Sequence, residues 1–199
     1  MVSKKILIIA GPNGAGKTTT ALELISNSPV LYEFINADEI ARGLAPKHPE
    51  SMALTASKLM ITRLKELLEN SKNFAFETTL SGKNYEKHLK EAKSNGYDVL
   101  LFFLWLSSPE QAIKRVAQRV SQGGHHVEED VIARRYRSGL KNLFESYLPL
   151  SDNAIIINNS TEDSKESTNN LIARKSTGDE IEVLNQEIWE KMNKVAYER

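Results

Sequence analysis

The sequence predicts an α/β protein with three layers, in which a central five-stranded parallel sheet lies between helices. Short apolar runs alternate with amphipathic stretches along most of the 199 residues, and this alternation is typical of strands joined by crossover helices. The two strongest apolar runs, at residues 6–10 and 99–106, contain no polar side chain. Such runs indicate strands that are covered on both faces, as in a parallel sheet.

Five segments have the composition of strands. They are residues 4–10, 33–36, 74–77, 98–106 and 154–158. Five segments between or beside them are predicted to be helices. These are residues 17–26, 51–70, 85–95, 109–121 and 129–147.

Two of the predicted helices carry specific signals. Within residues 51–70, an apolar stripe at helical spacing is formed by Leu59, Leu64, Leu67 and Leu68. The helix at 109–121 has a start signal in which Ser108 is the N-cap, Pro109 lies in the first turn and Gln111 closes a capping box.

The pattern changes after residue 158. Residues 160–170 are polar and charged, and they predict an exposed loop. Residues 171–175 and 180–184 flank the turn sequence Ser-Thr-Gly-Asp, which predicts a hairpin. Asn185 is expected to cap a last helix. With no internal repeat, residues 1–199 are predicted to form one domain whose C-terminal hairpin and helix span about 171–199.

Composition excludes several classes of protein. The 26 basic side chains balance the 26 acidic ones, which argues against a general binder of nucleic acid or of membranes. The absence of Cys excludes a disulfide framework, a thiolate metal site and a cysteine nucleophile. The apolar runs are too short to cross a bilayer and no signal-peptide pattern follows the N-terminus, so a cytoplasmic location is expected.

Residues 11–18 read Gly-Pro-Asn-Gly-Ala-Gly-Lys-Thr and fit the phosphate-loop pattern G-x-x-x-x-G-K-[ST]. Glycines let the backbone curl so that amide N–H groups point at a phosphate chain, and the following helix adds its positive N-terminus. Lys17 is expected to reach the β- and γ-phosphates, and the Thr18 hydroxyl to ligate Mg²⁺. The sequence therefore predicts a nucleoside triphosphate site. Its residues are Gly11, Pro12, Asn13, Gly14, Ala15, Gly16, Lys17, Thr18 and Thr19.

Other motifs narrow the class of phosphate-loop protein. No apolar strand ends in Asp-Glu, as ATP motors and transporters require, and no Asn-Lys-x-Asp base reader of GTPases is present. Residues 121–124, Ser-Gln-Gly-Gly, resemble a transporter signature in composition but not in order. Acidic groups after two strands and an arginine-rich segment after another are instead typical of small-molecule and nucleotide kinases.

Two carboxylates are candidate site residues. Asp38 follows the second strand, at the sheet edge where ligands of open α/β sheets bind. It could accept the proton of a substrate hydroxyl, or it could merely cap a helix that starts at Glu39. Glu77 ends the third strand. It could bind Mg²⁺ through water or hold a substrate hydroxyl, and the alternative is a solvated strand end.

Arginines cluster in the segment after the fourth strand. Arg115 and Arg119 share one helical face, and a second group follows the glycine pair at 123–124. This second group is Arg134, Arg135 and Arg137. Guanidinium groups stabilise the negative charge of a phosphoryl group during its transfer. Because a glycine pair separates the two arginine groups, residues of about 115–140 are predicted to form a mobile lid over the nucleotide. The alternative is a solvated basic face that pairs with acidic residues 128–130.

Two adjacent histidines, His125 and His126, lie between the arginine groups. Adjacent histidines point apart and no further ligand sits at a metal-binding spacing, which argues against zinc. One of them, with His125 as the candidate, is expected to shape the turn or to contact substrate.

Four segments together resemble the zeta-toxin-type kinases, and in particular a short bacterial branch of them. The segments are GPNGAGKTT at 11–19, INADEIARG at 35–43, FETTLSG at 76–82, and the stretch from Arg115 to Leu143. The resemblance covers roughly residues 4–158. It implies a P-loop NTPase fold of the nucleotide-kinase type, and the use of ATP and Mg²⁺ to phosphorylate a hydroxyl group. The best-known toxins act on a sugar hydroxyl of UDP-N-acetylglucosamine, and an antitoxin protein is the implied partner.

The resemblance also implies roles for individual residues. Asp38 is the implied catalytic base, and Glu77 and Thr79 match the Glu-x-Thr substrate motif. Lid arginines on the phosphates are Arg119 and either Arg134 or Arg135. The chain departs from the long toxins at two places: Ser81 stands where they carry Arg, and Tyr136-Arg137 where they carry His-Asp.

The leading functional hypothesis is therefore an ATP-dependent kinase for a small-molecule hydroxyl. A second hypothesis is an ATP-binding switch that hydrolyses slowly and acts through a partner, with the polar segment from Ser160 as its docking element. A nucleic-acid end kinase would need a basic groove with aromatic side chains, and the zero net charge and 7% aromatic content argue against it.

Overall fold

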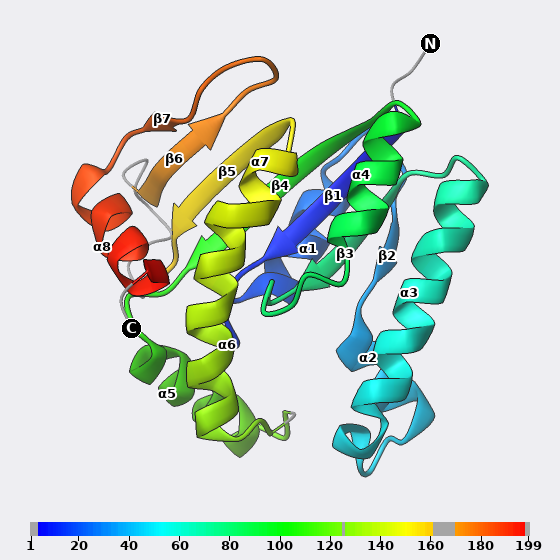
Figure 1. Ribbon diagram of the computed structural model, residues 1–199. Helices are drawn as coiled ribbons and strands as arrows, with labels where there is room; N and C mark the ends of the chain where they lie inside the picture. The colour runs from blue at the N-terminus through cyan, green and yellow to red at the C-terminus, as the bar shows by residue number, and fades with distance from the viewer. Residues whose placement is uncertain (1–3, 125, 161–169, 198–199) are drawn as a thin grey trace.

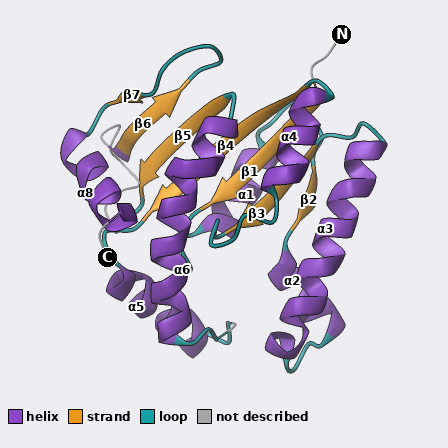
Figure 2. Ribbon diagram, viewed as in Figure 1, coloured by secondary structure: helices purple, strands orange, loops and turns teal. Residues whose placement is uncertain are grey.

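The computed structural model describes residues 4–124, 126–160 and 170–197. A seven-stranded sheet with the order β2-β3-β1-β4-β5-β6-β7 forms its centre. The strands are β1 (Lys4–Ala10), β2 (Glu33–Ile35), β3 (Phe74–Thr78), β4 (Tyr97–Trp105), β5 (Asn153–Asn158), β6 (Leu171–Lys175) and β7 (Glu182–Val183). Figure 2 shows them as a continuous twisted layer.

The first five strands pair in parallel, as predicted. The predicted count of five is wrong for the whole sheet, because the C-terminal hairpin joins it. Strand β6 pairs antiparallel with β5, and β7 pairs antiparallel with β6. The hairpin thus extends the sheet that carries the phosphate loop. The loop predicted at 160–170 falls mostly on residues 161–169, which lie outside the described part of the chain.

Helices occupy the predicted segments, with differences at their ends, and a further helix that was not among the predicted ones covers residues 37–44. They are α1 (Lys17–Ser26), α2 (Ala37–Leu44), the 3₁₀ helix η1 (Pro49–Met52), α3 (Ala53–Glu69), α4 (Glu86–Ser94), α5 (Pro109–Ser121), α6 (Glu129–Asn142), the π-helix η2 (Leu143–Tyr147), α7 (Leu148–Leu150) and α8 (Gln186–Tyr197). The predicted helix at 129–147 therefore changes to a π-helix in its last turn, and π-helical turns often occur beside functional sites. Asn185 caps α8 as expected, since its Oδ1 accepts a hydrogen bond from the Ile188 N–H at 3.1 Å.

Two local predictions need correction. Leu59 is 44% exposed, and Met60 is buried instead, because the buried face of α3 follows Ala56, Met60 and Leu64 at four-residue steps. Ser108 caps α5, but the capping box is not closed, since Gln111 Oε1 accepts from the N–H and hydroxyl of Ser107, both at 3.0 Å.

The sheet separates two apolar layers. Figure 1 shows α1 on one face and α3, α4, α6 and α8 on the other. Alternate residues of β1 serve the two faces: Ile6 and Ile8 join the larger core, whereas Leu7 and Ile9 pack with α1. No described helix has the length and apolar character needed to span a membrane.

The strand register brings the candidate site residues to one edge of the sheet. Ala10 pairs with Thr78, and Ile35 with Phe76, so β1, β2 and β3 end at nearly the same level. The phosphate loop follows β1, Asp38 follows β2, and Glu77 lies at the end of β3. Helices α2 and α6 flank this edge (Figure 1).

Candidate active site

The phosphate loop is held in a shape that only glycine permits at two positions. Gly11 has φ +145°, and a Cβ there would lie 2.3 Å from the Leu104 carbonyl oxygen. Gly14 has φ +76°, and a Cβ would lie 2.9 Å from the Arg115 Cβ. Outside the loop, the Asn159 Nδ2 donates to the Ala15 carbonyl at 2.8 Å. Contacts with the ends of β4 and β5 thus support the conformation of the loop.

Lys17 lies buried at the base of this loop. Its ammonium donates to the Pro12 carbonyl at 3.0 Å and lies 3.6 Å from Glu77 Oε1. Burial lowers the pKa of Lys17, and the guanidinium of Arg119 lowers it further, while the carboxylates of Glu77 and Asp38 act in the opposite direction. The charged groups predicted for the site therefore affect one another in the folded protein.

Glu77 lies on the phosphate-loop side of the site. Its Oε2 accepts hydrogen bonds from the Thr18 hydroxyl at 2.7 Å and from the Asn36 amide at 2.9 Å. The side chain is only 10% exposed, so the alternative of a solvated strand end is wrong. A carboxylate paired with the phosphate-loop hydroxyl provides the hard oxygen ligands that Mg²⁺ prefers. Sequence reasoning missed Asn36, although its place directly after β2 signals it.

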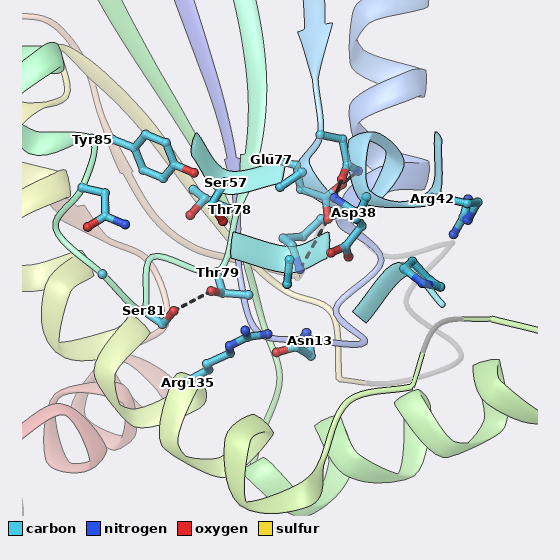
Figure 3. Close-up of a pocket in the computed structure, with 18 residues that line it drawn as sticks. Asn13, Asp38, Arg42, Ser57, Glu77, Thr78, Thr79, Ser81, Tyr85 and Arg135 are labelled. Atoms are coloured by element: carbon cyan, nitrogen blue, oxygen red, sulfur yellow. Dashed lines mark hydrogen bonds and ion pairs between the residues drawn. The ribbon is translucent and has the colours of Figure 1, made fainter. Parts of the chain in front are cut away.

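Asp38 stands in the first turn of α2 but does not cap the helix. The cap is Asn36, whose Oδ1 accepts from the backbone N–H of Asp38 at 2.8 Å and of Glu39 at 3.4 Å. The alternative reading of Asp38 as a helix cap is therefore wrong. Its side chain instead lines the same cavity as Lys17 and Glu77 (Figure 3).

The predicted arginines separate into different environments. Arg135 of α6 lines the cavity, and its guanidinium points toward Asn13 in Figure 3, whereas Arg134 is exposed. Arg119 of α5 is close enough to Lys17 to affect its pKa. Arg115 donates to the Ser160 carbonyl at 3.3 Å. The geometry thus favours Arg135 over Arg134 as the cation of α6 that faces the cavity.

The structure describes only one of the two adjacent histidines. His125 lies outside the described residues, so its expected role is not placed. The exposed His126 Nε2 lies 3.2 Å from Glu128 Oε1. Within the described ranges, no three His, Cys, Asp or Glu side chains come together as a metal cluster.

The loop after β3 forms another wall of the cavity. Thr79 and Ser81 share a hydrogen bond of 2.9 Å between their hydroxyls, and Leu80 between them has φ +56°. Helix α6 and the π-helix hold this loop: the Asn142 Nδ2 donates to the Leu80 carbonyl and the Tyr147 hydroxyl to the Gly82 carbonyl, both at 2.7 Å. Sequence reasoning missed this clamp, because no motif marks either donor.

The close packing of α6 on this loop also depends on a glycine. A Cβ on Gly139 would lie 2.5 Å from the Thr79 carbonyl oxygen. Arg135 lies one helical turn before Gly139. One helix therefore presents a cation to the phosphate loop and positions the loop that carries Thr79.

The residues present fit a magnesium triphosphate. Asn13 lines the cavity, and its Oδ1 is buried without a hydrogen-bond partner among the described residues, so this acceptor is available to a metal ion or to a donor group of a ligand. The glycines with positive φ give the loop a conformation in which successive N–H groups can face an anion, and Lys17 with the Thr18–Glu77 pair supplies the cation and the oxygen ligands. The sheet edge thus has the chemistry of a site for a triphosphate and Mg²⁺.

Comparison with known proteins places the chain in a family. The zeta toxin family model matches residues 2–163, which include the phosphate loop, Asp38, Glu77 and the arginine-bearing helices. The chain belongs to the zeta toxin family. A Haemophilus influenzae protein described as uncharacterized is 29% identical over 136 residues, which cover 68% of this chain and 95% of that protein.

Solved structures share the fold of this zeta toxin family member. The AvrRxo1-ORF1:AvrRxo1-ORF2 complex with sulphate ions gives a TM-score of 0.72 at 17% identity, over 96% of this chain and 63% of that one. The PezAT toxin–antitoxin system of Streptococcus pneumoniae gives 0.54 at 21%, over 84% and 74%. A putative kinase from Chloroflexus aurantiacus gives 0.52 at 13%, over 68% and 78%. The fold is that of the P-loop kinases, as the sequence predicted.

Proposed function

We propose that this zeta toxin family member transfers the γ-phosphate of ATP to a hydroxyl group of a small molecule. The observation that carries the proposal is the position of Asp38. Its carboxylate lines the cavity beside Lys17 and Glu77, while Asn36 performs the capping that would otherwise explain it. A carboxylate in this place can take the proton of an attacking hydroxyl.

The donor half of the site is built from the phosphate loop and α6. Backbone amides of residues 11–18 and the Lys17 ammonium would hold the triphosphate, with Arg135 and Arg119 as further cations. Thr18 and Glu77 would hold Mg²⁺, directly or through water. ATP supplies the phosphoryl group, and Mg²⁺ neutralises part of its charge. The cations stabilise the charge that develops on the phosphoryl oxygens during transfer.

The acceptor half contains Asp38 and the loop after β3. Asp38 would orient the hydroxyl and hold its proton as the oxygen attacks phosphorus. Thr79 would position the acceptor, as the family resemblance implies, and His125 is the further candidate. UDP-N-acetylglucosamine is the acceptor that the resemblance implies. An antitoxin is the proposed protein partner, in line with the toxin–antitoxin system among the structural neighbours.

The test is an acceptor screen with the purified chain. It is incubated with ATP, Mg²⁺ and hydroxyl-bearing metabolites that include UDP-N-acetylglucosamine, and products are detected by mass spectrometry. Asp38→Asn is expected to lower turnover by about 10²–10⁴-fold with ATP affinity retained. Glu39→Gln is the matched control, because Glu39 is the adjacent carboxylate and pairs with Arg42 on the surface. Full activity in Asp38→Asn, or no phosphorylated product at all, contradicts the proposal. Partner-stimulated hydrolysis without an acceptor supports the switch hypothesis instead.

A further inference from the structure

The cavity is divided by charge. Figure 3 shows Arg42 and Tyr85 at opposite ends, with Asp38 and Glu77 between them. The end near Tyr85 is lined by neutral hydrogen-bonding groups. They are Ser57, Thr79, Ser81, Asn84 and Tyr85. Along the part of the chain that the structure describes, the cations that line the cavity are Lys17, Arg42 and Arg135.

Each of these cations lies near the phosphate loop or pairs with a carboxylate at the surface. Lys17 sits inside the phosphate loop, bonded to the Pro12 carbonyl. Arg135 points toward that loop in Figure 3. The guanidinium of Arg42 donates to Glu39 Oε1 at 2.7 Å and is half exposed, at the end away from Tyr85. Among the described residues that line the cavity, no further cation is left to pair with a phosphate on an acceptor at the neutral end.

The carboxylates of the cavity also disfavour an acceptor that carries phosphate. Asp38 and Glu77 both line it, and a bound triphosphate would add further negative charge. An acceptor that carried phosphates would have to place them near these anions or against neutral groups. Burying a charge without an ionic partner is costly, and like charges repel at short range.

The neutral groups are suited to a different ligand. Four of the side chains can both donate hydrogen bonds to and accept hydrogen bonds from the hydroxyl groups of a ligand. They are the paired hydroxyls of Thr79 and Ser81, the Ser57 hydroxyl and the Asn84 amide. The Tyr85 ring is fixed against Phe76, with centroids 4.8 Å apart, and its hydroxyl contacts Met60 Sδ at 3.3 Å. Burial raises the pKa of Tyr85 to about 12, so this end stays uncharged. Such a wall accepts a ring that has an apolar face and several hydroxyls.

We propose that the phosphate acceptor is an uncharged polyhydroxyl compound, of the sugar or nucleoside class, and that the site discriminates against acceptors that already carry phosphate. This inference rests on the proposed kinase function and narrows its substrate. It departs from UDP-N-acetylglucosamine, whose diphosphate would need cations that the described residues of the neutral end do not supply.

The experiment uses charge to sort the acceptors. A deproteinised bacterial metabolite extract is divided on an anion exchanger into an unbound fraction, which contains neutral sugars and nucleosides, and a bound fraction of phosphorylated compounds. Each fraction is incubated with the full chain, Mg²⁺ and γ-labelled ATP, and labelled products other than inorganic phosphate are measured. Label is expected mainly in products from the unbound fraction, with Asp38→Asn as the blank.

Two variants at Ser81 sharpen the result. Ser81→Arg adds a cation to the neutral end, and is expected to lower the ratio of label in neutral to anionic acceptors by about tenfold. Ser81→Ala loses the same hydrogen bond to Thr79 without adding charge. Any change in the ratio that it causes measures the lost hydroxyl, and the added charge of Ser81→Arg is expected to lower the ratio well beyond that value.

The outcomes separate the two proposals. Label confined to anionic acceptors, or a ratio that Ser81→Arg leaves unchanged, overturns the neutral-acceptor inference while kinase activity stands. Absence of Asp38-dependent product from both fractions overturns the kinase proposal itself.

Discussion

Glu77 Oε2 accepts a hydrogen bond from the Thr18 hydroxyl at 2.7 Å, although the two residues are 59 positions apart in the sequence. Parallel pairing of β1 with β3 creates this relationship. The phosphate loop with Thr18 follows the end of β1, Glu77 lies at the end of β3, and the pairing brings both strand ends to one edge of the sheet. Among the described residues, Asp38 and Glu77 are the carboxylates that line the cavity, and this bond joins Glu77 to the phosphate loop. It places the Glu77 carboxylate beside the Thr18 hydroxyl, so that both would be within reach of one metal ion.

Glu77→Gln should therefore weaken the use of Mg²⁺. The amide keeps the size of the side chain but removes the charge, so the Mg²⁺ concentration for half-maximal ATP binding should rise by about 10–100-fold, as for other groups that support a metal. The measurement is an ATP titration at varied Mg²⁺. Glu39→Gln, which removes an exposed carboxylate, is the control, and an unchanged Mg²⁺ requirement in Glu77→Gln would show that Glu77 does not support the metal.

Lys17 should make ATP binding depend on pH. Burial lowers its pKa in the free protein from 10.5, and phosphate anions would raise it again by favouring the charged form. Binding then takes up protons between the two pKa values, so ATP affinity falls as pH rises through the lowered value. Between the lowered pKa and 10.5, Lys17 binds more protons in the unfolded chain than in the folded protein. Its contribution to the free energy of unfolding therefore rises with pH toward 10.5.

Calorimetry in two buffers of different ionisation enthalpy measures this proton uptake. Lys17→Arg is the control, since guanidinium remains charged over the whole range and should abolish uptake while retaining a cation. Equal uptake in the wild type and in Lys17→Arg would assign the protons to another group.

Arg135 and Arg134 offer a matched pair on one helix. Arg135→Ala should raise the dissociation constant for ATP or lower turnover by about tenfold or more, because it removes a cation from the cavity. Arg134→Ala removes an exposed cation of the same kind and should leave both within about twofold. The measurement is steady-state kinetics with varied ATP. Larger losses in Arg134→Ala would reverse the assignment.

The clamp on the loop after β3 should affect the acceptor more than ATP. Asn142→Ala and Tyr147→Phe each leave a backbone carbonyl of this loop without its donor, which should raise KM for the acceptor by about three- to tenfold. KM for ATP should change little. Lys141→Ala, at an exposed neighbouring position, is the control. If the two KM values rise together, the clamp supports the whole fold rather than the acceptor wall.

Replacing glycine by alanine should have opposite effects on stability at Gly11, where a Cβ does not fit, and at Gly43, where it does. Gly11→Ala should lower stability by about 1–3 kcal/mol, because its Cβ would lie against the Leu104 carbonyl and φ is unfavourable for alanine. Gly43→Ala, inside α2 with no atom near its Cβ, should raise stability by up to about 1 kcal/mol. Thermal unfolding of both variants tests this, and a stabilised Gly11→Ala would contradict the close approach seen in the structure.

Much of the fold could be predicted because its signals are local. Residues 4–10, 17–26 and 109–121 form the predicted elements with the predicted bounds, since apolar run length, the glycine-lysine junction and the Ser108 N-cap with Pro109 act over a few positions. The C-terminal hairpin was also visible as a pair of strands. Its pairing with β5 was not, because no local signal specifies which edge of a sheet a hairpin joins.

The sequence alone determined the α/β alternation, the phosphate loop with Lys17 and Thr18, and the candidate carboxylates Asp38 and Glu77. Only the tertiary structure decided that Asn36 caps α2, that Glu77 contacts the loop, and that Arg135 faces the cavity while Arg134 is exposed. The reason is physical. Phosphate binding needs a contiguous stretch of backbone, which a short motif records, whereas the acceptor wall is assembled from α3, α6 and the loop after β3, whose proximity arises from packing against a common sheet.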